Sequence, residues 1–232
     1  MNIQNSTHTK TEGLALVELF TSEGCSSCPP ADEVMEELQR EYKDKNVLLL
    51  AFHVDYWDQL GWKDIFSSAN FTERQNYYAS VFNLSSVYTP QAIINGSEEF
   101  VGSNKSGLEK AVEDHLKEVS TAAINLNAKE TSAGKIQISY STQGNNSENE
   151  QLVLLLVQNQ ATNKIGRGEN EGRTLHHINI VKEISYLPIP SKEEIAAFVI
   201  LSENKKEDFF IAAFVQNKKT GKITALAASK ID

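Results

Sequence analysis

The chain has 232 residues, 40% of them hydrophobic, and a formal net charge of −9. A chain of this length can bury at least one core and fits two domains better than one. The acidic balance argues against nucleic acid or an anionic membrane surface as a partner.

No apolar run is as long as a membrane-spanning helix, so we expect no membrane insertion. Residues 1–12 are polar, lack the apolar core of a signal peptide and are expected to form a disordered lead. The expected location is cytoplasmic, or periplasmic or secreted if a leader peptide has been removed. A cytoplasmic location would favour catalytic or metal-binding cysteines over structural ones.

The first structured stretch begins as an apolar run, residues 14–20, that is typical of a buried strand, and it ends in a helical pattern after two prolines. Between them lie the only two cysteines of the chain, Cys25 and Cys28. A thiol at a helix N-terminus meets unpaired N–H groups and the positive end of the helix dipole, which favour the reactive thiolate. The CxxC spacing also allows the two thiols to close a disulfide.

A CxxC pair alone is also compatible with half a zinc site or with a static structural disulfide. Zinc would need two more ligands, and no second CxxC or HxxxH pair exists to supply them, so we predict no metal site. The order of strand, CxxC and helix favours a redox site. In that interpretation Cys25 is the attacking and more exposed thiol, and Cys28 is the resolving thiol.

The following residues continue an α/β pattern. We predict a strand at 46–54, an aromatic segment at 55–66 with both tryptophans, a helix at 72–82 capped by Thr72, a hairpin turning at Asn95-Gly96, and a helix at 106–119. This order resembles the thioredoxin fold. In that superfamily the proline that starts the third strand is cis and lies against the disulfide, which implies this role for Pro90, after Thr89.

From residue 121 the pattern changes: 124–128 and 136–140 alternate with period two, and further candidate strands follow, separated by turns rich in Asn, Ser and Gly. The predicted strands are 124–128, 136–140, 151–158, 176–184, 195–201, 209–216 and 222–228. We therefore expect an α/β thioredoxin-like domain at 13–120 and an all-β, sandwich-like domain at 121–232, resembling immunoglobulin domains but without their cysteine framework.

Four blocks carry a closer resemblance: VELFTSEGCSSCPPAD, FHVDYWDQLGWKDIFSS with FTERQNYYA, YTPQAIING and GENEGRTLHHINIVKEI. They are similar to the signature blocks of an uncharacterised bacterial thioredoxin-like family known as domain of unknown function 1223, many of whose members are secreted. The resemblance implies a thioredoxin-like domain joined to a β-rich domain and names no substrate.

Further candidate residues surround the motif. Glu18 lies near the position where thioredoxins keep a buried acid that relays the proton of the resolving thiol, and burial would raise its pKa; a solvated strand-edge carboxylate is the alternative. His53 and Asp55 follow the second strand at the edge where ligands of open α/β sheets bind, although a core histidine and a turn cap are alternatives. Trp57 belongs to an aromatic cluster that packs in the core or walls a substrate cleft.

The segment 166–177 contains three glycines, paired opposite charges and two adjacent histidines. Its composition is typical of a surface loop, whereas its place among the family blocks suggests that it docks beside the dithiol. If it continues as a strand, His176 and His177 point to opposite faces, so at most one of them serves a common site.

The sequence thus predicts a thiol-disulfide oxidoreductase without a cofactor, which acts on protein or small-molecule thiols and disulfides. Cys25 attacks, Cys28 resolves, and Thr89-Pro90 presents backbone to the bound substrate. The alternatives are a binding protein on a thioredoxin-like scaffold that carries copper(I) on its two thiolates, and a module whose disulfide only staples its helix. The redox direction and the oligomeric state stay open.

Overall fold

The computed structural model describes residues 13–120, 122–132, 134–144, 148–200 and 205–232. The predicted disordered lead, 1–12, lies outside the described residues. No helix in these ranges is long and apolar enough to cross a membrane.

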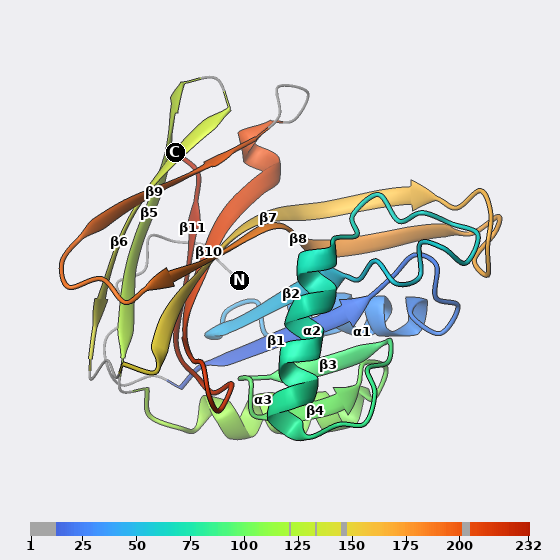
Figure 1. Cartoon of the computed structure of the whole chain (residues 1–232), viewed down its shortest axis with the longest axis horizontal. Coiled ribbons are helices and arrows are strands. Elements are labelled where there is room, and N and C mark those ends of the chain that lie inside the picture. The colour runs from blue at the N-terminus through green and yellow to red at the C-terminus, as the bar shows by residue number, and fades with distance from the viewer. Residues whose placement is uncertain (1–12, 121, 133, 145–147, 201–204) are drawn as a thin grey trace.

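The first half of the chain alternates strands and helices (Figure 1). Its elements are β1 (Ala15–Thr21), α1 (Pro29–Glu41), β2 (Val47–His53), α2 (Ala69–Phe82), β3 (Gln91–Ile94), β4 (Glu98–Val101) and α3 (Lys105–Leu116). The second half, in its described residues, contains strands and one short 3-10 helix. These are β5 (Ala123–Ser132), β6 (Lys135–Gln143), β7 (Glu150–Lys164), β8 (Thr174–Pro188), β9 (Glu194–Val199), η1 (Lys206–Asp208), β10 (Phe209–Asn217) and β11 (Ile223–Lys230).

The fold is mixed α/β, with one large mixed sheet and a second, antiparallel sheet. The large sheet has eight strands in the order β11-β10-β7-β8-β2-β1-β3-β4, and the small sheet has the order β5-β6-β9. β1 and β2 are parallel, while β3 is antiparallel to β1. β8 joins the strands of the two halves through a parallel pairing of Ala51 with Ile180. The domain boundary predicted at residues 120 and 121 therefore falls between halves that share one sheet.

Alternating side chains of β1 build two separate cores. Ala15, Val17 and Leu19 pack with apolar residues of α1 and α3. Leu16 and Phe20 point to the other face, where they meet α2 and strands of the second half. Each fully buried apolar side chain of this kind stabilises the fold by about 1.5–3 kcal/mol. Helices thus cover both faces of the first-half strands.

The small sheet packs on the second-half strands of the large sheet. Their shared core is apolar and takes alternate residues from each strand, among them Ile124, Ile138, Leu154, Ile211 and Ala225. Two facing sheets therefore form this end of the molecule, as Figure 1 shows for β5, β6 and β9 beside β10 and β11.

The hairpin predicted at Asn95-Gly96 is present between β3 and β4. Both residues have left-handed backbone, with φ of 47° and 62°. Gly96 is required for a second reason, because a Cβ atom there would lie 1.9 Å from the carbonyl oxygen of Gly221. This turn therefore also brings β3 against the loop between β10 and β11.

Helix α2 begins earlier than predicted. Its N-cap is Ser68, whose backbone is extended and whose hydroxyl accepts a hydrogen bond from the N–H of Asn70. Thr72 lies inside the helix instead, because its backbone N–H already donates to the carbonyl oxygen of Ser68, and its hydroxyl bonds Asp55. The predicted cap at Thr72 is wrong for this reason.

Candidate active site

Cys25 and Cys28 are joined by a disulfide, and their Cα atoms are 5.5 Å apart. Cys28 is the N-cap of α1, and Pro29 is its first residue. Proline is tolerated there because N–H groups of the first turn have no partner within the helix. The carbonyl oxygen of Cys28 accepts hydrogen bonds from Ala31 N at 2.8 Å and Asp32 N at 3.2 Å. The disulfide therefore lies at the N-terminal, positive end of the helix dipole.

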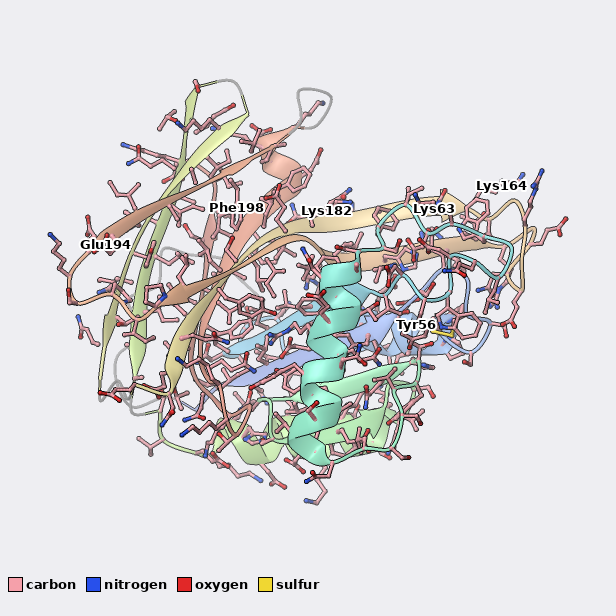
Figure 2. All side chains as sticks on the ribbon, viewed as in Figure 1. Tyr56, Lys63, Lys164, Lys182, Glu194 and Phe198 are labelled. Carbon is pink, nitrogen blue, oxygen red and sulfur yellow. A yellow bond between two sulfur atoms is a disulfide. The ribbon has the colours of Figure 1, made fainter. Side chains whose placement is uncertain are left out.

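Both cysteines are fully buried, with 0% of their surface exposed. Ser26 and Ser27 between them are exposed. Figure 2 shows the disulfide, in yellow, beside Tyr56. The prediction that Cys25 is the more exposed thiol is wrong, because segments distant in sequence pack over the CxxC loop.

The first covering segment is the turn between β7 and β8, residues 165–173, which we call the hairpin tip. Figure 1 shows β7 and β8 running together toward the segment that follows β2. Asn170 of the tip is fully buried, and its Nδ2 donates to the carbonyl oxygens of Glu23 and Cys25, each at 2.9 Å. The tip therefore docks beside the dithiol and is not a free surface loop.

Glu169 makes a second contact from the tip. Its Oε2 accepts a 3.0 Å hydrogen bond from the backbone N–H of Ser26. Trp62 packs closely under the tip, since a Cβ atom at Gly168, whose φ is +79°, would lie 3.2 Å from the Cβ atom of Trp62. One of the two tryptophans thus serves as the surface on which the tip rests.

Thr89 and Pro90 lie on another side of the disulfide. Their peptide bond is cis, as the thioredoxin resemblance implies. The Sγ atom of Cys25 is 3.9 Å from the carbonyl oxygen of Thr89, and Ser27 Oγ is 3.5 Å from the same oxygen. Trp57 Nε1 donates to Thr89 Oγ1 at 2.8 Å. The structure therefore brings three predicted site residues, Cys25, Thr89 and Trp57, into one constellation.

A buried polar cluster lies beside the CxxC loop. The carboxylate of Glu23 accepts hydrogen bonds from Trp62 Nε1 at 2.8 Å and from Asn163 Nδ2 at 3.0 Å. His177 lies between two carboxylates, with Nε2 3.5 Å from Glu23 Oε1 and Nδ1 3.5 Å from Asp32 Oδ2. Burial lowers the pKa of His177, but these two acceptors outweigh it and raise the pKa to about 10. An imidazolium therefore sits between two acids at neutral pH.

His53 belongs to the same cluster. It is fully buried, its Nδ1 is 2.7 Å from Asp64 Oδ2, and its ring meets that of His177 edge to face at 4.7 Å. Burial raises the pKa of Asp64, but the charge and hydrogen bond of His53 lower it overall. His53 is thus enclosed in the protein, whereas the predicted substrate-binding role needs an accessible side chain.

Glu18 lies on the opposite face of the sheet from α1. It shares the face of Leu16 and Phe20, and Arg74 binds both of its oxygens, at 2.5 and 2.9 Å. The hydroxyl of Tyr78 also donates to it. Burial lowers the pKa of Arg74, but the charge of Glu18 raises it well above its usual range. The structure does not bring Glu18 together with the dithiol, so the predicted proton relay lacks the required proximity.

Asp55 anchors the loop after β2. Its Oδ1 accepts a hydrogen bond from Thr72 Oγ1 at 2.5 Å, and its N–H donates to the same hydroxyl at 3.2 Å. The contact ties this loop to α2, and it differs from the cap on the next turn that the sequence offered as an alternative. A substrate-binding role for Asp55 stays a prediction.

Sequence reasoning missed several members of the site. Glu23, Asp32, Glu169 and Asn170 were not singled out, although all four stand inside the family blocks. Alternation along β8 was informative, because His177 is buried in the cluster while His176 is exposed and contacts Thr162. Among the described residues no group of three or more His, Cys, Asp and Glu is arranged to hold a metal ion.

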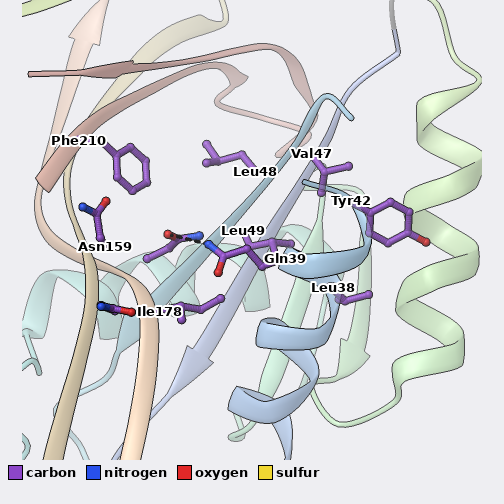
Figure 3. A pocket seen from close by; sticks show the side chains of 11 residues that line it. Leu38, Gln39, Tyr42, Val47, Leu48, Leu49, Asn159, Ile178 and Phe210 are labelled. Carbon is purple, nitrogen blue, oxygen red and sulfur yellow. Dashed lines mark hydrogen bonds between the residues drawn. The ribbon is translucent and has the colours of Figure 1, made fainter. Parts of the chain in front are cut away.

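A cavity of about 260 Å³ lies at the C-terminal end of α1, between that helix, β2 and β8 (Figure 3). Its lining is uncharged and combines apolar side chains such as Leu48 and Phe210 with amides such as Asn159. Gln39 Nε2 donates to Asn179 Oδ1 there at 3.4 Å. The cavity does not include the cysteines, so it is separate from the dithiol site.

The chain is similar to known proteins along most of its length. A family model described as "Protein of unknown function (DUF1223)" matches residues 16–216. No curated protein matches the chain. The crystal structure of protein AGR_C_4864 from Agrobacterium tumefaciens is 25% identical, with a TM-score of 0.68, and the match covers 94% of each chain.

A domain of the outer membrane lipoprotein Omp28 from Porphyromonas gingivalis is 14% identical, with a TM-score of 0.36. The match covers 50% of this chain and 91% of that one. This similarity is too distant to inform the fold.

Proposed function

The chain belongs to the DUF1223 family, described as proteins of unknown function, and we propose from its dithiol site that it is a thiol-disulfide oxidoreductase. The observation that carries the proposal is the Cys25–Cys28 disulfide at the N-terminus of α1, beside the backbone of Thr89. A dithiol in this setting has the positive helix end that favours a thiolate.

We also propose that the first half is thioredoxin-like. The strand order β2-β1-β3-β4, with β1 and β2 parallel and β3 antiparallel, supports this description. The cis bond before Pro90 and the place of the cysteines at the start of α1 support it too.

In the reducing direction the proposed chemistry has two steps. The Cys25 thiolate attacks one sulfur of a substrate disulfide, forms a mixed disulfide and releases the other substrate sulfur as a thiolate. Cys28 then loses its proton and attacks Cys25 Sγ, which forms the Cys25–Cys28 disulfide and releases the second substrate thiolate. Two electrons pass to the substrate, and the reverse sequence oxidises a substrate dithiol.

Access to Cys25 requires a change at the covering segments. Cys25 is fully buried, its sulfur lies 3.9 Å from the carbonyl oxygen of Thr89, and the hairpin tip bonds its backbone carbonyl, while Ser26 and Ser27 are exposed. In this proposal the tip, which bonds the CxxC loop through Asn170 and Glu169 and packs on Trp62, moves aside to open a route to the sulfur.

A second candidate is a structural disulfide, and the complete burial of both cysteines favours it. In that case the bond would stabilise the start of α1 and would not exchange with other thiols. The predicted alternative of a copper(I) carrier stays a prediction.

Thiol trapping in glutathione buffers separates these functions. We expect a reversible midpoint in the wild type, and a mixed disulfide with glutathione through Cys25 in the Cys28→Ser variant. A disulfide that stays oxidised under strong reductant, with no adduct in the variant, would favour the structural role.

A further inference from the structure

The backbone donors around Cys25 are mostly occupied. The N–H of Ser26, directly after Cys25, is bonded to Glu169, and the N–H of Cys28 is bonded to the carbonyl oxygen of Cys25. Pro29 and Pro30 have no N–H. A Cys25 thiolate would normally draw on donors of this kind. Here the backbone donor directly after Cys25 is already bonded to a carboxylate.

The charged groups around the dithiol come from several parts of the chain. They are Glu23 before the motif, Asp32 of α1, His177 of β8 with the His53–Asp64 pair beside it, and Glu169 and Arg173 of the hairpin tip. His177 is balanced by its two acids, and Arg173 is bonded to Asn170. Glu169 is the carboxylate that bonds the peptide N–H directly after Cys25. The hydrogen bonds from Ser26 lower the pKa of Glu169, so it is charged at neutral pH.

We propose that Glu169 is a positioning residue that makes the Cys25 thiolate less favourable and so biases the dithiol site toward its disulfide. This inference rests on the proposed function and adds one contribution to its redox equilibrium, which favours the disulfide. The physical reason is like-charge repulsion, since a carboxylate next to a thiol raises the pKa of the thiol. A disulfide is a strong oxidant when its reduced form is stabilised, and Glu169 acts in the opposite sense.

The equilibrium with glutathione measures this bias. Two molecules of glutathione are oxidised to one glutathione disulfide. Their two electrons and two protons reduce the Cys25–Cys28 disulfide to two thiols. In the Glu169→Gln variant the amide oxygen can still accept the bond from Ser26, so the tip can dock, but the charge is gone. We expect the equilibrium constant for reduction to rise about threefold, the size of an exposed charge effect at a helix end.

Glu171→Gln is the matched control, because it removes the same charge from an exposed position in the same tip. We expect its constant to equal that of the wild type. In a Cys28→Ser background, the pH dependence of iodoacetamide alkylation should show a lower pKa for the Cys25 thiol when Glu169 is replaced by Gln. The difference should shrink in about 1 M salt, where the screening length falls to about 3 Å.

The outcomes separate the two proposals. A wild-type disulfide that no thiol reduces would overturn the proposed oxidoreductase. If the wild-type disulfide is reduced reversibly but the equilibrium constant for reduction is the same in Glu169→Gln, only the role of Glu169 would be overturned. The same conclusion follows if Glu171→Gln gives an equal shift, or if the shift persists undiminished in high salt, because the cause would then be general surface charge or altered structure.

Discussion

The side-chain amide of Asn170 donates a 2.9 Å hydrogen bond to the carbonyl oxygen of Cys25, 145 residues earlier in the chain. The same amide group bonds the carbonyl oxygen of Glu23. One buried side chain of the second half therefore fixes the backbone of Cys25.

Replacing Asn170 with Ala should loosen this attachment. The buried carbonyl of Glu23 loses its bond from Asn170, and the carbonyl of Cys25 keeps only the bond from the N–H of Cys28, so we expect unfolding in urea to show a loss of about 1–3 kcal/mol. The disulfide should also be reduced faster by dithiothreitol, because the tip opens more often. Asn127→Ala, at an exposed position of β5, is the control and should change neither value. An unchanged reduction rate in Asn170→Ala would mean that the tip does not limit access.

Replacing Glu18 with Gln tests whether this acid takes part in the chemistry. It leaves the buried Arg74 charge without its partner, so we expect a loss of about 3–5 kcal/mol in the free energy of unfolding. The glutathione midpoint should stay the same, because Glu18 faces away from α1. A folded variant with a shifted midpoint would show that Glu18 influences the dithiol chemistry.

His177 makes stability depend on pH. Its pKa in the folded protein is about 10, above the usual value of 6.5, so folding favours the protonated form. This contribution is fully present below about pH 6.5 and is lost as pH rises to 10, with a slope of up to about 1.4 kcal/mol per pH unit. Urea unfolding of His177→Asn from pH 6 to 9.5 should lack this slope, while the exposed His176→Asn should retain it. Equal slopes in both variants would contradict the assignment.

Gly96→Ala should destabilise the protein by more than Gly172→Ala. Both glycines have left-handed backbone, but a Cβ atom meets a carbonyl at 1.9 Å at Gly96 and nothing within 4 Å at Gly172. We expect the left-handed backbone to cost either variant about 1 kcal/mol of unfolding free energy. Crowding at Gly96 should cost that variant roughly a further 1–3 kcal/mol. Thermal unfolding of both variants measures the difference, and equal losses would show that the close approach to Gly221 relaxes freely.

Local signals predicted the elements well. Period-two alternation identified the strands at 124–128 and 136–140, and the Asn95-Gly96 pair identified its turn, because both patterns are set by neighbouring residues. The prediction that His176 and His177 face opposite ways follows from the same alternation, and the structure bears it out.

Long-range relationships were harder to predict. Alternate residues of β1 face opposite sides of the sheet, with α1 on one side and Arg74 on the other. Sequence spacing alone does not say which side Glu18 faces. The hydrogen bond from Asn170 to the carbonyl oxygen of Cys25 depends on where the hairpin tip lies, which is set by the length and direction of two paired strands. Nothing local to the CxxC motif indicates that partner.

The shared sheet has a consequence for how this chain can be divided or recombined. A fragment ending at residue 120 would keep both cysteines but lose Glu169, Asn170 and His177. It would also expose the apolar side chains of β2 that pack on Val153 and Phe210 in the intact protein. Neither half can be moved onto another scaffold with the site intact. A recombined protein would keep the site only if it kept both halves together.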